Sequence, residues 1–357
     1  MQIFQISRAN ALVFFSWLIA LLSIFTLAGC SNDKNFIEIR TEMDLYNIRY
    51  NLLGNYTLLN DITLNTTLDA LSGWEPIGDN VNSFTGIFEG NGHKINNLWI
   101  NRLSTTYVGL FGYLRDARIK NLGVEIDSSK GGVKGHNNVG SIAGMVNDSS
   151  ITNSYSTGDV SGGSFIGGIA GDIFKGEITN SYSNGDISGS SYIGGITGEL
   201  SISADIVNSY SKGNISGGSF VGGIAGIAGI SASIINSYSM GNISGNNYIG
   251  GIAGEVSMSA TVLHNVAINQ IINGSNANRI VGYNSGGTVH DNFALNIIKV
   301  NDSSMVSNNN LNGEDKSDME LKIQSTYENL SWRFGNYKIN PWKIDESSSY
   351  PYFYWQK

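Results

Sequence analysis

The sequence predicts an all-β protein built as a parallel β-helix, or β-solenoid, and three observations support this prediction. Gly accounts for 45 of the 357 residues, and only 14% of the residues are charged, against roughly 25% in an average globular domain. A unit of 27 or 28 residues recurs through the middle of the chain. All three prolines lie outside this array, as expected if the array consists of hydrogen-bonded strands.

The composition also argues against several classes of protein. The formal net charge is −8, whereas a nucleic-acid-binding protein needs clustered Lys and Arg. The Gly content excludes a coiled coil, and the single cysteine excludes an internal disulfide framework. Because 41% of the residues are hydrophobic, we expect a folded chain rather than a disordered one.

The pattern of residues at the N-terminus is typical of an export signal. An apolar stretch covers residues 11–28, and a Leu-Ala-Gly tripeptide leads directly into Cys30. This ending resembles the lipobox of bacterial lipoproteins. The resemblance implies a signal peptide over residues 1–29, acyl lipid such as palmitate on Cys30, and a lipidated tether over residues 30–36. The alternative is an uncleaved signal anchor. Either way the membrane is a predicted partner, and the expected location is the outer membrane or the cell surface.

Residues 37–105 are predicted to form an N-terminal cap and the first coils. A capping-box pattern that begins at Thr41 predicts a short helix, and strands are expected at 56–59 and 62–64. A solenoid needs such a cap because its end otherwise exposes an open sheet edge.

Residues 106–298 contain the repeat array. Apolar and polar residues alternate in short runs separated by Gly or Asn, which predicts strands. One repeat fits one coil of a solenoid, so equivalent residues should stack ~4.8 Å apart along its axis. One Asn per coil is predicted to form a structural ladder by hydrogen-bonding to the coils above and below. The predicted ladder is Asn121, Asn153, Asn180, Asn208, Asn236, Asn265 and Asn292.

At these repeats the chain resembles the GLUG-motif family of bacterial surface proteins. The Gly-Leu-apolar-Gly run stands at residues 109–112, and later copies keep its Gly frame. The lead-in at residues 74–95 and the ending at residues 342–352 are also similar to the family. The resemblance implies a right-handed β-helix and an adhesin-like surface protein. The motif also occurs beside the zinc peptidase domain of immunoglobulin A1-cleaving enzymes.

Residues 299–357 are predicted to end the fold as a polar loop, a short helix over residues 317–330 and an aromatic C-terminal cap. We expect the aromatic residues to cover the last coil, and a ligand-binding aromatic patch is the alternative. These residues are Trp332, Trp342, Tyr350, Tyr352, Phe353, Tyr354 and Trp355.

The sequence predicts no enzymatic site. None of the four His residues lies in a His-Glu-x-x-His pattern, so no zinc peptidase site is expected. Asp159 and Asp186 occupy equivalent positions in adjacent coils, a spacing that would suit Ca²⁺. Asn214 and Asn242 replace them in the next two coils, which favours a structural turn. We therefore predict no catalytic residue, no metal site and no cofactor.

Two aromatic columns are the strongest binding features of the sequence. Tyr155, Tyr182, Tyr210 and Tyr238 form the candidate ligand surface, because a tyrosine offers a flat apolar face and a hydroxyl. The alternative is that these rings pack inward or only stack on each other. The second column consists of Tyr107, Phe165, Tyr192, Phe220 and Tyr248.

These features predict a surface-anchored bacterial lipoprotein with a binding or adhesion role and no enzymatic activity. A glycan, or a protein on a host or another surface, is the expected ligand. Two alternatives stay open: a carbohydrate-active β-helix enzyme, and an accessory subunit of a larger envelope assembly.

Overall fold

The computed structural model describes residues 35–65, 69–304, 309–336 and 339–356. The solenoid belongs to a compact unit that covers Phe36–Lys357. The predicted signal peptide and Cys30 lie outside the described residues. In the described part of the chain, no helix is both long enough and apolar enough to cross a membrane.

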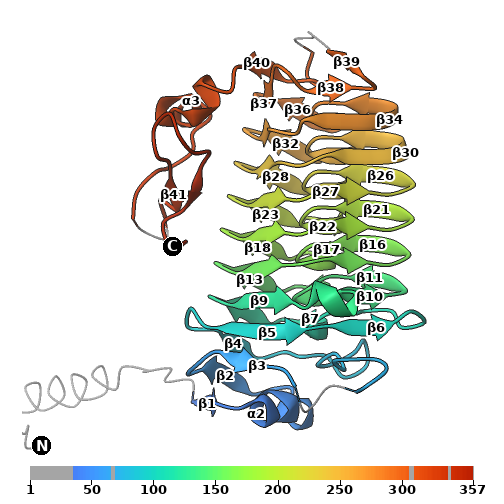
Figure 1. Cartoon of the computed structure of the whole chain (residues 1–357), viewed down its shortest axis with the longest axis vertical. Coiled ribbons are helices and arrows are strands. Elements are labelled where there is room, and N and C mark those ends of the chain that lie inside the picture. Colours follow the sequence, from blue (N-terminus) through green and yellow to red (C-terminus); the bar gives the residue numbers. More distant parts are fainter. Residues whose placement is uncertain (1–34, 66–68, 305–308, 337–338, 357) are drawn as a thin grey trace, which may run out of the picture. The chain divides into compact units, whose positions relative to one another are not determined.

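Phe36–Lys357 folds as a right-handed parallel β-solenoid, which confirms the predicted fold class (Figure 1). One coil of the array contains five short strands. The coil that begins at residue 150 consists of β13 (Ser150–Thr152), β14 (Tyr155–Thr157), β15 (Val160–Ser161), β16 (Ser164–Gly167) and β17 (Ala170–Phe174). The next coil begins with β18 (Glu177–Thr179), which pairs with β13 in parallel and in register.

Stacking of the coils produces four long sheets. The first sheet has ten parallel strands, in the order β1 (Phe36–Ile39), β2 (Asn55–Leu58), β4 (Ile87–Glu89), β8 (Arg118–Lys120), β13, β18, β23 (Asp205–Val207), β28 (Ser233–Ile235), β32 (Thr261–Leu263) and β36 (Thr288–His290). The second sheet also has ten, in the order β3 (Ile62–Thr63), β5 (Lys94–Leu98), β9 (Gly123–Ile126), β14, β19 (Tyr182–Asn184), β24 (Tyr210–Lys212), β29 (Tyr238–Ser239), β33 (Val266–Ala267), β37 (Phe293–Leu295) and β40 (Glu314–Lys316).

The other two long sheets complete each coil. The third has seven strands, in the order β7 (Phe111–Arg115), β12 (Ala143–Asn147), β17, β22 (Thr197–Ser201), β27 (Ala225–Ala228), β31 (Ala253–Val256) and β35 (Val281–Asn284). The fourth has thirteen: β6 (Ile100–Arg102), β10 (Val133–Gly135), β15, β20 (Ile187–Ser188), β25 (Ile215–Ser216), β30 (Ile243–Gly250), β26 (Ser219–Gly222), β21 (Ser191–Gly194), β16 and β11 (Asn137–Val139), with β34 (Ile271–Asn278) beside β30, β38 (Lys299–Val300) beside β34 and β39 (Ser303–Ser304) beside β38. Four coils each contribute two strands to this fourth sheet, namely β10 and β11, β15 and β16, β20 and β21, and β25 and β26.

The interior is filled by columns of aliphatic side chains, one from each coil. Ile151, Ile178 and Ile206 stack in the first sheet and are fully buried. Burying one aliphatic side chain of this size contributes about 1.5–3 kcal/mol. If a residue at one of these positions faced outward, the column would be interrupted. The sequence repeat therefore fixes which residues of neighbouring coils pair with each other.

The N-terminal cap has the expected form. The helix α2 (Glu42–Asn47) begins at the N-cap Thr41, whose side chain accepts a hydrogen bond from the backbone N–H of Asp44. The Asp44 carboxylate accepts in return from the N–H of Thr41 at 2.9 Å, which completes the capping box. Leu45 on this helix is fully buried, and a 3₁₀ turn (Ile48–Tyr50) follows.

The other end of the solenoid is closed partly by a buried ion pair. The guanidinium of Arg279 is fully buried and lies 2.5 Å from the Asp315 carboxylate. The segment expected to be a polar loop contains three short strands, β38, β39 and β40. The expected helix over residues 317–330 is a 3₁₀ turn (Glu320–Lys322) followed by the five-residue α3 (Gln324–Glu328).

The aromatic cluster near the C-terminus is present, but it does not lie where the sequence led us to expect it. Instead of covering the last coil, the C-terminal segment runs down the side of the solenoid (Figure 1). It contains the two-stranded sheet of β41 (Trp342–Lys343) and β42 (Tyr352–Phe353). The indole N–H of Trp332 fixes its upper part by donating to the carbonyl of His264 at 2.7 Å. The position of this segment decides which outward surfaces stay accessible.

Candidate functional site

The asparagine ladder lies at the corner between the first and second sheets. Asn121, Asn153, Asn180 and Asn208 each adopt the left-handed backbone conformation, with φ between 49° and 53°. Asn tolerates this conformation better than most residues. The side-chain amide of Asn153 donates to Asn121 at 3.1 Å, that of Asn180 to Asn153 at 3.1 Å, and that of Asn208 to Asn180 at 3.2 Å. The structure therefore brings these four predicted residues together in one hydrogen-bonded line.

Asn265 and Asn292 do not continue this line, so their predicted place in the ladder is wrong. Strand pairing sets Leu263 beside Ile235 and Val266 beside Tyr238, which puts His264, not Asn265, one rung above Asn236. The corner residues of the last two coils are His264 and Asp291, with φ of 60° and 51°. We call the whole set the corner column: Asn121, Asn153, Asn180, Asn208, Asn236, His264 and Asp291.

Asn265 and Asn292 instead point into the solenoid, where the earlier coils have Ser. The side-chain carbonyl of Asn265 accepts a hydrogen bond from the backbone N–H of Ser237 at 3.0 Å, and its side-chain amide donates one to the backbone carbonyl of Ile234 at 2.8 Å. Its amide also donates to Asn292 Oδ1 at 3.1 Å. Because His, Asp and Asn are all tolerated in the left-handed conformation, the sequence has no signal that separates the two positions.

The candidate ligand residues, Tyr155, Tyr182, Tyr210 and Tyr238, form a stacked column on the outside of the second sheet. Ser156 beside Tyr155 points inward, where its hydroxyl donates to the Gly168 carbonyl at 2.8 Å, so the tyrosine points outward. Consecutive ring centroids lie 5.0, 4.9 and 4.7 Å apart, and the ring planes are within 10° of parallel. We call these four residues the tyrosine column.

The C-terminal segment covers most of the tyrosine column. Tyr210 and Tyr238 are fully buried, whereas Tyr155 and Tyr182 are only half-buried. The Tyr238 hydroxyl donates to the carbonyl of Pro351 at 2.8 Å, and Tyr210 accepts a hydrogen bond from Gln356. Burial raises the pKa of both Tyr210 and Tyr238. Tyr210 and Tyr238 therefore belong to the core, and a ligand has access to the column only at its half-buried end, Tyr155 and Tyr182.

A pocket of about 460 Å³ lies at that accessible end of the tyrosine column. Gly123 occupies the tyrosine position one coil earlier, so the stack of rings stops there. A Cβ at Gly123 would lie 2.6 Å from the Tyr155 hydroxyl oxygen, so only glycine lets this ring lie across it. We call this cavity the tyrosine pocket; it is lined by Gly92, Asn121, Leu122, Gly123, Asn153, Tyr155, Tyr182, Tyr354, Trp355 and Gln356.

The tyrosine pocket combines aromatic rings with amides and has no lining side chain that is charged at neutral pH. Trp355 lies nearly parallel to Tyr155 and Tyr182, with ring centroids 6.3 and 5.8 Å away. Its volume lies within the usual range for small-molecule sites. This chemistry suits a neutral ring that carries both C–H faces and hydroxyl groups.

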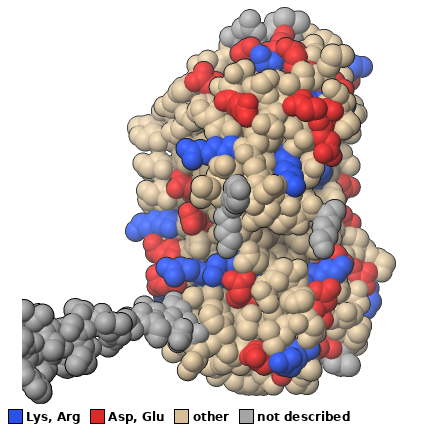
Figure 2. All heavy atoms as spheres, turned by 90° about the vertical axis from the view of Figure 1, so that its left-hand side faces the viewer, with Lys and Arg blue, Asp and Glu red and all other residues tan. Residues whose placement is uncertain are grey.

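Two further pockets lie along the corner column. One, of about 420 Å³, is lined by Asn180, Asn208 and Asn236 together with Arg333 and Ile339 of the C-terminal segment. Figure 2 shows this side of the molecule, on which acidic and basic side chains are interspersed.

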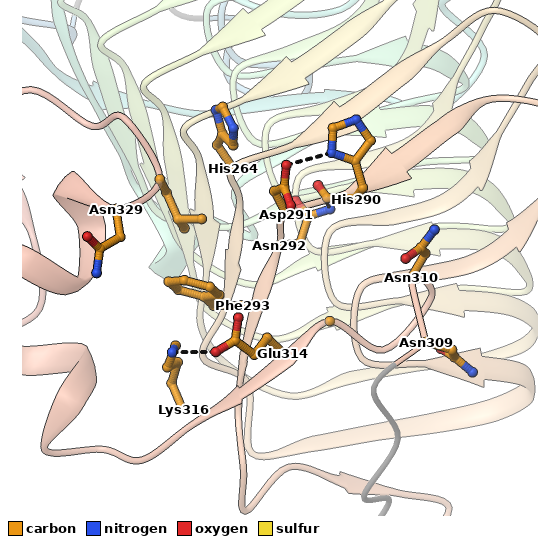
Figure 3. Close-up of a pocket in the computed structure, with 12 residues that line it drawn as sticks. His264, His290, Asp291, Asn292, Phe293, Asn309, Asn310, Glu314, Lys316 and Asn329 are labelled. Atoms are coloured by element: carbon orange, nitrogen blue, oxygen red, sulfur yellow. Dashed lines mark hydrogen bonds and ion pairs between the residues drawn. The ribbon is translucent and has the colours of Figure 1, made fainter.

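The other pocket, of about 640 Å³, lies at the end of the column around His264 and Asp291 (Figure 3). There the His290 ring pairs with Asp291 at 2.8 Å, and Lys316 pairs with Glu314 at 2.6 Å. Burial lowers the pKa of His264, and the charge of Asp291 opposes this shift. Within the described part of the chain, no group of three or more His, Cys, Asp or Glu side chains could hold a metal ion.

The second aromatic column differs from the first in backbone and surroundings. Phe165, Tyr192, Phe220 and Tyr248 stack with centroids 4.7 to 5.1 Å apart, and each has a φ of 58° to 61°. Among the described residues, no ring of the C-terminal segment contacts this column. The rings are half-buried, and their faces are occupied by their neighbours. A ligand therefore meets ring edges there, not faces.

A pair of carboxylates on the third sheet was not among the residues singled out from the sequence. Asp172 on β17 lies in register with Glu199 on β22. Burial and the nearby charge of Glu199 raise the pKa of Asp172 to about 7, and burial also raises the pKa of Glu199. The Ser201 hydroxyl donates to Asp172 at 3.2 Å. Their equivalent position in adjacent coils is visible in the sequence, but their burial is not.

Comparison with known proteins gives relatives but no family. No protein-family model matches the chain. A "Putative Gly-rich membrane protein" of Evansella cellulosilytica is 40% identical over 110 residues, which are 29% of this chain and 12% of that protein. Halomucin of Haloquadratum walsbyi is 32% identical over 136 residues, 36% of this chain and 2% of that protein. The chain thus matches only a small part of either relative.

A solved structure supports the fold. A crystal structure of a "putative immunoglobulin A1 protease" from Bacteroides ovatus superposes with a TM-score of 0.62 and 23% sequence identity. The superposition covers 91% of this chain and 94% of that one. At this identity the likeness concerns the β-solenoid alone. Of the two sequence relatives, one is named a membrane protein and the other a halomucin.

Proposed function

We propose that this protein is a non-enzymatic surface protein that binds a neutral carbohydrate, and that the tyrosine pocket is its binding site. The observation that carries the proposal is the lining of this pocket, which joins the rings of Tyr155, Tyr182 and Trp355 to the amides of Asn121 and Asn153. Aromatic rings pack against the apolar faces of sugars, and amides both donate and accept hydrogen bonds. The absence of charged lining residues argues against an ionic ligand.

The proposal includes attachment to a membrane through lipid on Cys30. The support comes from the Leu-Ala-Gly-Cys sequence and from the names of the two relatives, a membrane protein and a halomucin. Several acyl chains on one residue hold a protein firmly, whereas one chain binds only marginally. Cys30→Ala should leave either an unprocessed form that keeps residues 1–29 or a released form that moves from the detergent-rich to the aqueous phase in detergent partitioning. A Ser31→Ala variant is the matched control and should stay with the detergent.

The binding proposal is tested by calorimetry of the soluble chain that begins after Cys30, against a panel of neutral sugars and their short oligomers. Trp355→Ala removes one wall of the tyrosine pocket and should lower the affinity at least about tenfold. Tyr283→Ala removes an exposed ring on another face and should leave affinity unchanged. If no neutral sugar binds, or if both variants bind equally well, the proposal is wrong. Melting temperatures of both variants show whether the fold is intact.

A second candidate function, a carbohydrate-active enzyme, is favoured by Asp172 and Glu199. Two neighbouring carboxyl groups, one of them with a pKa of about 7, are the groups that a glycosidase uses as acid and base. The two residues lie on the third sheet, away from the tyrosine pocket. Release of reducing ends from a polysaccharide by pure protein, abolished in Asp172→Asn, would support this alternative. Binding without release would support the first proposal.

A further inference from the structure

We infer that the ligand is a linear, largely neutral polysaccharide that lies lengthwise along the corner column, and not a single sugar held only in the tyrosine pocket. This inference rests on the proposed carbohydrate-binding function and extends it from one pocket to a groove.

The first observation is that every rung of the corner column lines a pocket. Asn121 and Asn153 line the tyrosine pocket, and Asn180, Asn208 and Asn236 line the second pocket. His264 and Asp291 line the third. The hydrogen bonds between consecutive asparagines show that the first two pockets meet along one continuous line of side chains. The seven rungs are separated by six steps of ~4.8 Å, so the groove is about 29 Å long.

The second observation is that one segment forms the opposite wall of all three pockets. The C-terminal segment contributes Asn329 and Leu330 to the third pocket and Arg333 to the second. It then returns to contribute Trp355 and Gln356 to the tyrosine pocket. Its course down the side of the solenoid matches the direction of the column (Figure 1). The groove is therefore bounded on both sides along its length.

The third observation concerns the polar groups that the ladder leaves free. In the bonds from Asn180 to Asn153 and from Asn208 to Asn180, each amide uses one N–H and each carbonyl one lone pair. A side-chain amide has two N–H groups, and its carbonyl oxygen has two lone pairs. Each asparagine of this line thus retains a donor and an acceptor; Asn153 and Asn180 are buried, so a ligand reaches the line at the half-buried Asn121, Asn208 and Asn236. A polymer with hydroxyl groups on every unit can satisfy such an array.

Charge and spacing argue against other polymers. Arg333 is the charged residue that lines the second pocket, and in the third pocket Lys316 and His290 are paired with Glu314 and Asp291. A strongly anionic polymer therefore finds few free cations. Along one edge of an extended peptide, hydrogen-bonding groups recur at every second residue, or about every 6.8 Å. This repeat does not match the rung spacing of ~4.8 Å.

The inference predicts that affinity depends on the length of the ligand. The probes are β-1,4-linked oligomers of glucose and of N-acetylglucosamine, from one to six sugars, measured by calorimetry with the soluble chain. If the ligand occupies the groove, affinity should rise at least about tenfold between the dimer and the hexamer of the series that binds. Equal affinity of dimer and hexamer would overturn the groove but leave the pocket proposal standing. If neither series binds at any length, the groove inference is wrong, whereas the pocket proposal is decided by the wider panel of neutral sugars.

Two variants locate the extra contacts. Asn208→Leu removes the polar groups of one mid-groove rung and should weaken hexamer binding about tenfold while leaving dimer binding unchanged. Arg333→Gln, on the opposite wall and exposed, should act in the same direction without disturbing the ladder. Asn214→Leu is the control, because Asn214 lies on a different corner, where it hydrogen-bonds to Asp186. If both groove variants bind hexamer like the control, the inference is wrong.

Discussion

The two aromatic columns show how similar side-chain stacks acquire different roles. Both have nearly parallel rings about one rung apart, with centroids at 4.7 to 5.1 Å. The tyrosine column lies on extended strands of the second sheet and is covered by the C-terminal segment. The second column lies on residues with left-handed backbone within strands of the fourth sheet and is not covered by that segment. The first column therefore belongs to the packed part of the protein over much of its length, whereas the second is a surface feature.

The difference in burial predicts the largest effect. A Tyr210→Ala/Tyr238→Ala variant removes two fully buried rings and should lose about 3–5 kcal/mol of unfolding free energy for each. The matched variant Tyr192→Ala/Phe220→Ala removes two half-buried rings and should lose less than half as much. Urea unfolding of both variants makes the comparison. Equal losses would show that the C-terminal segment does not cover the tyrosine column in solution.

The next effect concerns the position of the late asparagines. Asn265→Ala leaves the N–H of Ser237 and the carbonyl of Ile234 without their partner inside the solenoid, which should cost about 1–3 kcal/mol. Asn208→Ala at the half-exposed corner should cost less, because water can reach part of that site. A larger loss at Asn208 than at Asn265, measured by urea unfolding, would contradict the placement of Asn265 in the interior.

How much of this could be predicted depends on whether a feature repeats. The Gly-Gly motifs and the alternating Ile residues fix the coil and its register, because each coil pairs with a copy of itself. The register predicted from the sequence is wrong at Asn265. There an Asn stands in place of the inward-facing Ser of the earlier coils, and His264 stands in place of the corner Asn. The course of the C-terminal segment could not be predicted, because residues 317–356 occur once and contact coils more than a hundred residues earlier, as Pro351 does with Tyr238. The tyrosine pocket depends on that contact.

The carboxylate pair of Asp172 and Glu199 on the third sheet predicts a pH effect of a few degrees in melting temperature. The pKa of Asp172 is raised to about 7 from an ordinary value of 3.8, so the native state holds a proton that the unfolded chain has lost. Stability from this group is therefore complete below about pH 4 and is lost as the pH rises to about 7. Asp172→Asn should flatten the fall in melting temperature between pH 4.5 and 7.5. A variant with the wild-type slope would show that Asp172 titrates normally; Asp159→Asn is the control.

The smallest predicted effect tests the backbone difference between the two columns. The difference in stability between a Gly variant and an Ala variant should have opposite signs in the two columns. At Tyr192, with a φ of 59°, an L-residue pays for the left-handed conformation, so Tyr192→Gly should be more stable than Tyr192→Ala by about 1 kcal/mol. At Tyr182, on the extended strand β19, Gly gains nothing from its freedom, so Tyr182→Gly should be less stable than Tyr182→Ala by about 0.5–1 kcal/mol. Both substitutions in each pair remove the same ring, so the loss of stacking cancels within the pair. Four melting curves under one condition give the two differences. If they have the same sign, the two columns do not differ in backbone conformation, and the contrast between them reduces to burial alone.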